Sequence, residues 1–412
     1  MQRPVSGITY IIRRLLPAIL AIGSLLDSVS SIPAQTWTAT SLPSTEYLRV
    51  ASSADGMTLL AGTYDGPVYQ STNAGVSWAA LTIPLPAAPY WIVLSNWHGV
   101  ASSALGNTIA AVGFTGPLCV STNAGVTWSE TNIGGTFQGV ACSADGRRLV
   151  AVNAQEFAPP VSSGIFLSDD GGSTWTLGNA PGNMWLSVAC SADGTTMAAV
   201  GPAVYVSTNS GATWYPTASP SGSYISIACS ADGTRLIACT FSPGGVFTST
   251  DTGATWTRAN LTNLDYFGVA SSADGTKLAA AAHAGPIYRS LDSGITWTPM
   301  DAPYTNWYAL ASSADGNALV AASMDNNGTY LGLVYTWQSI PAPRLNLAPS
   351  TGNLVLSWTL PSRKFVLQQN WDFTTSNWTD VTTAPVLNCT SLQNEVTIPA
   401  TPGSMFYRLI SR

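Results

Sequence analysis

The sequence predicts an all-β protein, on three observations. Only 9% of the 412 residues are charged, whereas glycine (37), proline (26) and tryptophan (15) are abundant. A seven-residue segment, first seen as Val50-Ala-Ser-Ser-Ala-Asp-Gly56, recurs along the chain. A second segment, first seen as Ser71-Thr-Asn-Ala-Gly-Val-Ser-Trp78, recurs between the copies of the first. Short strands joined by many tight turns account for such a composition and spacing.

The first segment predicts a β-hairpin. Its seven copies are Val50–Gly56, Val100–Gly106, Val140–Gly146, Val188–Gly194, Ile227–Gly233, Val269–Gly275 and Leu310–Gly316. Apolar β-type runs flank each Ala-Asp-Gly, and the glycine supplies the positive φ that a tight turn needs. Leu105 replaces the aspartate in one copy, so we expect that turn to tolerate the loss of its cap.

The second segment predicts a side-chain-capped turn. Its six copies are Ser71–Trp78, Ser121–Trp128, Ser168–Trp175, Ser207–Trp214, Ser249–Trp256 and Ser290–Trp297. The third position is Asn73, Asn123, Asp170, Asn209, Asp251 or Asp292. Such a side chain accepts hydrogen bonds from backbone N–H groups of its own turn. The closing tryptophan is expected to fasten the hairpin to the core.

Each repeat supplies four strands in about 40 residues, which is one propeller blade. The seventh unit lacks the second segment and ends at Gly332–Trp337, which matches third-strand segments of other units. Gln35–Thr40 matches fourth-strand segments such as Ile295–Met300. We therefore predict a seven-bladed β-propeller whose N-terminal strand completes the last blade and removes two sheet edges.

Three regions are expected. Residues 1–34 are typical of a signal peptide, with Arg13 and Arg14 before the apolar run Leu15–Leu26 and small residues up to Ala34. Cleavage would leave no stable membrane span and a secreted, periplasmic or cell-surface protein; an uncleaved anchor is the alternative. The propeller covers 35–340. Residues 344–412 change pattern and predict a small β-sandwich-like domain.

The cysteines are expected to be free thiols, although exported chains often carry disulfides. Cys142, Cys190 and Cys229 occupy a repeat position at which serine stands in the other copies, namely Ser52, Ser102, Ser271 and Ser312. A position that alternates between cysteine and serine is typical of a small buried packing site.

Composition also excludes several function classes. The net charge of −6 and the lack of a basic stripe argue against nucleic acid. His98 and His283 are the only histidines, too few for most catalytic zinc sites. No glycine-rich phosphate loop leads from a strand into a helix. We expect no metal, no cofactor and no nucleotide.

The second segment resembles the Asp-box, or bacterial neuraminidase (BNR), repeat. Over about three hundred residues the chain is similar to propellers of the photosystem II assembly-factor type and the sialidase-like superfamily, as an exported bacterial member. The photosynthetic members carry a basic surface patch that this acidic chain lacks, so the resemblance implies the fold and not that role. The C-terminal region loosely resembles terminal modules of large exported bacterial proteins.

Binding is expected on the face of the propeller opposite the two turn types, where the loops vary most. The longest of these loops span 81–96, with Trp91, and 153–163. An aromatic residue also stands three positions before each copy of the first segment: Tyr47, Trp97, Phe137, Trp185, Tyr224, Tyr266 and Trp307. Two interpretations stay open. These rings pack between blades, or they form a stacking surface for a ligand at the channel mouth.

An enzyme is the less favoured interpretation. Sialidases clamp their substrate with convergent arginines, but Arg147 and Arg148 fall on the turn side and the typical Arg-Ile-Pro signature is missing. A xyloglucanase-like glycosidase needs two carboxyl groups at a suitable separation. Candidates on the variable face are Asp65, Glu156, Asp265 and Asp301, which no spacing pairs. We therefore expect a non-enzymatic binding or scaffold protein for a glycan or protein partner, with a glycoside hydrolase and an assembly-factor-like structural protein as alternatives.

Overall fold

The computed structural model describes residues 36–84, 96–114, 116–131, 133, 135–154, 163–324, 331–339, 345–350, 353–359, 365–371, 377–388, 392–399 and 405–411. Every regular element in these ranges is a β-strand. Within the same ranges we find no helix with the length and apolar character needed to cross a membrane. The predicted signal peptide lies outside the described residues.

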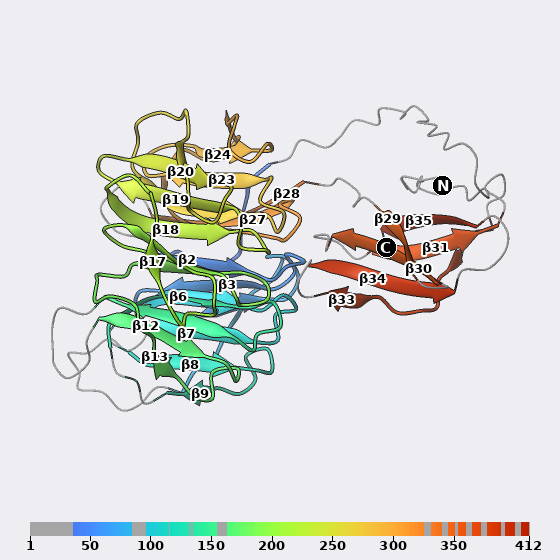
Figure 1. Cartoon of the computed structure of the whole chain (residues 1–412), viewed down its shortest axis with the longest axis horizontal. Helices are drawn as coiled ribbons and strands as arrows, with labels where there is room; N and C mark the ends of the chain where they lie inside the picture. The colour runs from blue at the N-terminus through green and yellow to red at the C-terminus, as the bar shows by residue number, and fades with distance from the viewer. Residues whose placement is uncertain are drawn as a thin grey trace.

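The repeat region folds into four-stranded antiparallel sheets that follow one another along the chain (Figure 1). The first three are β2 (Tyr47–Ser52), β3 (Leu59–Thr63), β4 (Tyr69–Ser71) and β5 (Ala79–Ala80); β6 (Trp97–Ser102), β7 (Ile109–Gly113), β8 (Leu118–Ser121) and β9 (Ser129–Glu130); and β10 (Phe137–Cys142), β11 (Leu149–Asn153), β12 (Gly164–Ser168) and β13 (Thr176–Leu177). The next three are β14 (Ser187–Cys190), β15 (Met197–Val200), β16 (Val204–Ser207) and β17 (Tyr215–Pro216); β18 (Ser223–Cys229), β19 (Leu236–Phe241), β20 (Gly245–Ser249) and β21 (Thr257–Arg258); and β22 (Tyr266–Ser271), β23 (Leu278–Ala282), β24 (Ile287–Ser290) and β25 (Thr298–Pro299).

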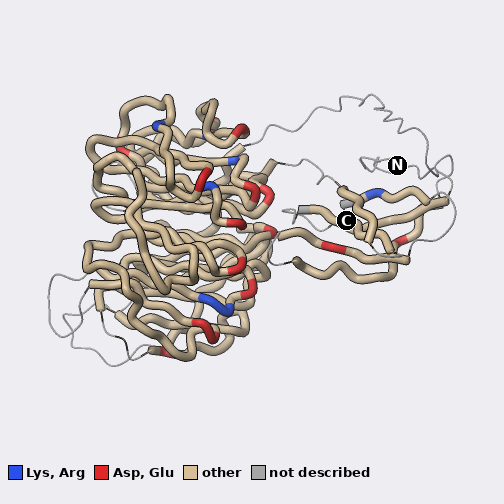
Figure 2. The backbone as a smooth tube through the Cα atoms, viewed as in Figure 1, with Lys and Arg blue, Asp and Glu red and all other residues tan. Residues whose placement is uncertain are grey.

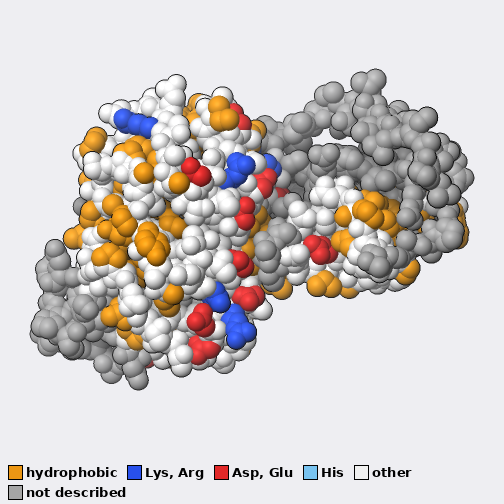
Figure 3. Space-filling model, in the orientation of Figure 1, with side chains coloured by type: hydrophobic (Ala, Val, Ile, Leu, Met, Phe, Trp, Pro, Cys, Tyr) orange, Lys and Arg blue, Asp and Glu red, His pale blue; other side chains and the backbone are white. Residues whose placement is uncertain are grey.

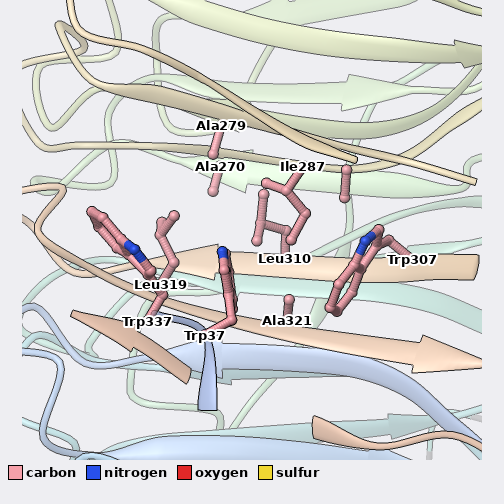
Figure 4. Close-up of a cluster of buried hydrophobic side chains, with 10 residues drawn as sticks. Trp37, Ala270, Ala279, Ile287, Trp307, Leu310, Leu319, Ala321 and Trp337 are labelled. Carbon is pink, nitrogen blue, oxygen red and sulfur yellow. The ribbon is translucent and has the colours of Figure 1, made fainter. Parts of the chain in front are cut away.

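The remaining sheet of the repeat region joins the two ends of that region. It contains β26 (Asn306–Ser312), β27 (Ala318–Met324), β28 (Val334–Gln338) and, as its outer strand, β1 (Thr38–Ala39). Thr38 pairs with Thr336 and Ala39 with Tyr335. The pairing expected of the N-terminal segment is therefore present. Trp37 packs between Trp307 and Trp337, with ring centres 5.8 and 6.4 Å away, and this cluster extends to Leu310 and Ile287 (Figure 4).

The first strands of these sheets form a closed ring around a central channel. Each first strand contacts the next, and β26 contacts β2. At the turn end of the ring, the alanine of each Ala-Asp-Gly copy donates its N–H to the carbonyl of the next alanine. The seven bonds run from Ala54 to Ala104, Ala144, Ala192, Ala231, Ala273, Ala314 and back to Ala54, at 2.7–3.0 Å. Buried backbone groups need such partners, and this cycle supplies them between neighbouring sheets. The ring makes the chain an all-β propeller.

The six eight-residue turns have the internal hydrogen bonds that their sequence predicts. In the first, Ser77 N–H donates to Asn73 Oδ1 at 2.9 Å, and Trp78 Nε1–H donates to the Gly75 carbonyl at 3.2 Å. Ala74 and Gly75 both adopt positive φ, 58° and 86°, which glycine allows and most residues resist. Asn123, Asp170, Asn209, Asp251 and Asp292 accept the equivalent N–H bond in their own turns.

The aspartates of the Ala-Asp-Gly turns cap those turns with hydrogen bonds, and in the one copy without an aspartate another side chain takes that role. In the first turn Asp55 Oδ1 accepts from Ser53 Oγ at 2.6 Å and from Met57 N–H at 2.9 Å. In the second turn, where Leu105 stands and is exposed, Asn107 Oδ1 accepts from Ser103 Oγ at 2.8 Å instead. Asn107 therefore caps this turn from a position two residues after the one that aspartate occupies in the other copies.

The C-terminal residues form two further sheets with their own core. One contains β29 (Asn346–Ser350), β30 (Asn353–Thr359), β34 (Gln393–Pro399) and β33 (Val386–Asn388); the other contains β32 (Thr379–Asp380), β31 (Phe365–Asn370) and β35 (Phe406–Ser411). Leu356, Trp358 and Leu409 are buried in that core.

The C-terminal sheets lie beside the turn end of the propeller (Figure 1). Leu387 and Leu392 pack against the alanine ring through Ala54, Ala104 and Ala314. The side of the propeller toward these sheets also gathers most of its charged residues (Figure 2). We call this end the turn face and the opposite end the long-loop face. Leu392 also lines a cavity at the turn-face end of the channel.

Candidate functional site at the long-loop mouth of the channel

The predicted aromatic ring is a packing element, so its interpretation as a stacking surface is wrong. Tyr47, Trp97, Phe137, Trp185, Tyr224, Tyr266 and Trp307 are all 0–1% exposed. A ligand cannot stack on rings that have no free face. The reason lies in the third strand, which in six of the sheets supplies a second ring to the same layer.

In six sheets the first-strand aromatic contacts an aromatic of the third strand across a small second-strand residue. The pairs are Tyr47–Tyr69, Phe137–Phe166, Trp185–Tyr205, Tyr224–Phe247, Tyr266–Tyr288 and Trp307–Tyr335, with ring centres 5.3–6.5 Å apart. Three tyrosines also donate to a carbonyl four residues earlier, for example Tyr47 Oη to Pro43 O at 2.6 Å. The rings therefore fill the wedge between sheets, and the three tyrosines also anchor the loop before their own first strand.

A β-bulge follows the aromatic in most first strands, and in four of them the bulged residue lines the channel mouth. The register shifts directly after the aromatic in six of the first strands. The residues at the bulged position are Leu48, His98, Gln138, Ile225, Phe267 and Tyr308. Bulges often re-aim side chains beside functional sites. Gln138, Ile225, Phe267 and Tyr308 line a cavity of about 130 Å³ at the long-loop mouth.

Arg49 is the exceptional residue of this cavity. The position after the bulge is Gly99, Gly139, Ser187, Ser226, Gly268 or Ala309 in the other sheets. The small size is needed there, because a Cβ on Gly268 would lie 2.9 Å from the Leu310 nitrogen of the next strand. Only the first sheet places a long cation at this position.

The guanidinium of Arg49 is held but not neutralised. Its Nη1 donates to the Leu48 carbonyl at 2.8 Å, and its Cζ lies 5.6 Å from the centre of the Tyr308 ring. Among the described residues the one ion pair joins Arg148 to Asp169, on the turn face. Arg49 is half-buried, so its charge is screened less than that of a fully exposed side chain. The mouth therefore presents an uncompensated positive charge.

A polar side of the mouth lies next to Arg49. His98 Nδ1 and Gln138 Oε1 are 2.9 Å apart, and the His98 ring lies 4.8 Å from that of Phe114. The pKa of His98 is lowered to about 4: burial is the largest cause, the hydrogen bond to Gln138 opposes it, and the charge of Arg49 adds to it. His98 is thus neutral at pH 7, so it offers hydrogen-bonding groups at the mouth and adds no positive charge to that of Arg49.

The side of the mouth opposite His98 and Gln138 is aromatic. The Phe267 ring contacts Tyr308 (5.2 Å between centres), His283 (5.0 Å) and Phe241 (5.4 Å). Phe241 is 43% exposed, and the other three rings are half-buried. Apolar side chains are scattered over the propeller away from the charged turn face (Figure 3). A partner at this mouth would meet a cation, a neutral polar pair and an open aromatic group together.

The remaining predicted loop residues divide in three ways. Trp91 and Glu156 lie outside the described residues. Asp265 Oδ1 accepts from Ser242 N–H at 3.1 Å, which gives it a loop-closing role. Asp301 is exposed.

One carboxylate pair was not foreseen. Glu46 directly precedes Tyr47, and its pKa is raised first by burial and then by the nearby charge of Asp65. The sequence could have indicated this pair, because Glu46 precedes the first strand and Asp65 follows the second strand of the same repeat, so that both lie at the same end of the hairpin. Asp65, one of the predicted carboxylates, thus gains an acidic neighbour.

The arginines do not converge as a sialidase site requires. Arg148 pairs with Asp169 at 3.4 Å, and Arg289 donates to the Gly316 carbonyl at 2.8 Å, both on the turn face. Arg258 donates to Gly244 O and Asn263 Oδ1 at 3.0 and 2.8 Å. In the part of the chain that the structure describes, no group of three or more His, Cys, Asp or Glu side chains could hold a metal ion.

The fold has clear relatives among solved structures. YCF48 bound to a D1 peptide matches over 76% of this chain and 100% of its own, with 17% identity and a TM-score of 0.54. YCF48 from Cyanidioschyzon merolae matches over 73% and 98%, with 17% identity and a TM-score of 0.55. The GH74 xyloglucanase from Xanthomonas campestris matches over 79% of this chain but 59% of its own, with 17% identity and a TM-score of 0.54.

These likenesses show the propeller fold and do not assign an activity, because both a peptide-binding propeller and a glycoside hydrolase are among them. No family model matches the sequence. No curated protein matches it either.

Proposed function

We propose that this chain is an exported, non-enzymatic binding propeller that takes an anionic group of a glycan or protein partner into the long-loop mouth. The observation that carries the proposal is Arg49, a half-buried cation with no carboxylate partner among the described residues, at a position that is Gly, Ser or Ala in the six other sheets. In this proposal the seven sheets are Asp-box blades spanning 35–340, residues 1–34 are removed on export, and 344–412 form an attachment domain.

The chemistry of the mouth favours a carboxylate flanked by apolar or ring-shaped groups. A guanidinium prefers a carboxylate because it offers parallel N–H donors. Phe267 and Phe241 supply faces for sugar rings or apolar side chains. The structural likeness to a YCF48 propeller with a bound peptide supports a protein partner, and uronic-acid polysaccharides offer the same carboxylate on a sugar.

The experiment is a binding screen on arrays of acidic and neutral polysaccharides and of peptides with acidic or C-terminal carboxylates. Three proteins are compared: the wild type, Arg49→Gln, and Arg258→Gln as a control at the outer edge of the fifth sheet. The proposal expects saturable binding that Arg49→Gln removes and Arg258→Gln keeps. Binding that survives Arg49→Gln unchanged would overturn it.

A second candidate, a glycoside hydrolase, has the observation of Glu46 and Asp65 in its favour. A carboxyl group whose pKa is raised by burial and by a neighbouring carboxyl group is the arrangement that a general acid needs. The test is release of reducing ends from neutral polysaccharides at pH 5. Turnover that Glu46→Gln abolishes would favour the hydrolase, and no turnover over the panel would leave binding as the function.

A further inference from the structure

Three thiols stand side by side at the other end of the channel. Cys142, Cys190 and Cys229 are the last residues of β10, β14 and β18, the first strands of three consecutive sheets. They line a cavity of about 150 Å³ at the turn face, together with serines at the equivalent position of the four remaining sheets and with Leu392. This cluster has no part in the proposed binding at the long-loop mouth.

The alanine ring holds the three strands close together at this level. Two residues beyond the cysteines, Ala144 N–H donates to Ala192 O at 2.8 Å, and Ala192 N–H donates to Ala231 O at 2.7 Å. These bonds bring the ends of neighbouring first strands into contact, and the three cysteines line one cavity. Cys190 therefore has a thiol neighbour on each side.

The thiols are free and protonated at neutral pH. None of the five described cysteines is in a disulfide. Burial raises the pKa of Cys142 and of Cys229 to about 12. The pKa of Cys190 is raised by burial first and then by Cys229 and Cys142. Such thiols are slow nucleophiles, and a bound cation would reverse the cost of ionising them.

We propose that Cys190 and one of its neighbours, Cys142 or Cys229, bind a thiophilic d10 ion such as Cu(I) in linear two-sulfur coordination. Two ligands are all that such an ion needs, which agrees with the absence of a three-ligand cluster among the described residues. Soft thiolates select Cu(I) over harder ions. Two S–H bonds break and two S–Cu bonds form, so each ion bound releases two protons to solvent and no electron is transferred. Leu392 and the alanines of the ring line the cavity on the side of the C-terminal sheets, and serines complete its wall.

The experiment measures transfer of Cu(I) under nitrogen from a coloured bidentate chelator to the full chain. Cys389 is replaced by Ser in every protein, since it lies outside the described residues. The expected result is loss of one equivalent of chelator colour per chain, with a new sulfur-to-copper absorption in the ultraviolet. The Cys142→Ser, Cys190→Ser, Cys229→Ser triple variant is expected to take up none.

The repeat supplies the control for folding. Serine occupies the same position at Ser52, Ser102, Ser271 and Ser312, so the triple variant is expected to keep the thermal unfolding transition of the wild type. Cys119→Ser, in the core between the first and second sheets, is the matched control and is expected to keep full uptake. Uptake by the triple variant equal to wild type, no uptake by the wild type, or a thiol count showing a disulfide among the three would each overturn the proposal.

Discussion

The guanidinium carbon of Arg49 lies 5.6 Å from the centre of the Tyr308 side-chain ring. Arg49 is on β2 and Tyr308 is on β26, the two strands that meet where the propeller closes. This contact joins residues that are far apart in the chain. It depends on ring closure, because β26 is placed by the sheet that β1 completes. The candidate site and the closure of the propeller are therefore linked, and the following predictions test that link and the fold that supports it.

The aromatic residues before each repeat should behave as core. Trp307→Ala removes a fully buried ring that contacts both Trp37 and Tyr335. We expect the free energy of unfolding to fall by about 3–5 kcal/mol, the usual cost of truncating a buried tryptophan. Phe241→Ala, which removes a partly exposed ring at the mouth, is the control and should change stability far less. Urea unfolding followed by tryptophan fluorescence measures both, and equal small losses would contradict the packing role.

Closure by the N-terminal strand should be needed for a stable monomer. A chain that begins after Thr40 lacks β1 and exposes the edge of β28. Exposed edges pair with other chains, so we expect a lower unfolding temperature and concentration-dependent association. Analytical ultracentrifugation and thermal unfolding check this. A truncated chain that stays monomeric and equally stable would show that β1 is dispensable.

The capped turns should make stability fall in acid. Hydrogen bonds from Thr174 and Ser168 lower the pKa of Asp170 to about 2. A carboxyl group with a lowered folded pKa stabilises the fold above its unfolded pKa, near 4. That contribution is lost as the pH falls from about 4 toward 2. Asp170→Asn, which copies the residue found at Asn73, Asn123 and Asn209, should reduce the slope in this window. Thermal unfolding from pH 5 to pH 2 is the measurement, and an unchanged slope would count against the turn geometry.

His98 should add a second pH dependence in a different window. Its pKa is lowered to about 4, mainly by burial, while an unfolded histidine titrates near 6.5. The unfolded chain therefore binds the proton first, and folding stability decreases as the pH falls from about 6.5 to 4, with no further loss from this group below that. His98→Gln should flatten that segment of the curve. An NMR titration of the His98 ring with a pKa at or above 6.5 would contradict its placement.

The sequence predicted the sheet order and the ring closure because each repeat carries its own turn chemistry. Asn73 and Gly75 define one turn locally, and Gln35–Thr40 matches an outer strand by simple comparison. The candidate site was not predictable in the same way. Tyr47 and Trp307 are buried because third-strand rings such as Tyr69 and Tyr335 reach them. The bulges that aim Phe267 and Tyr308 at the mouth arise from register and not from residue type. Arg49 could have been noticed, since alignment of the repeats shows a long cation where the others have a small residue.

The central claim is that the uncompensated charge of Arg49 receives an anionic group of the partner. It is tested most directly by calorimetric titration of the tightest array ligand, and of the same ligand with its carboxylate converted to a neutral amide, into wild type and Arg49→Gln. The account predicts that the wild type loses about 10-fold or more in affinity for the amide, as for a charge-assisted hydrogen bond, and that Arg49→Gln binds both ligands equally. If Arg49→Gln keeps the wild-type preference for the carboxylate, the partner's charge is received elsewhere and the assignment of this mouth is contradicted.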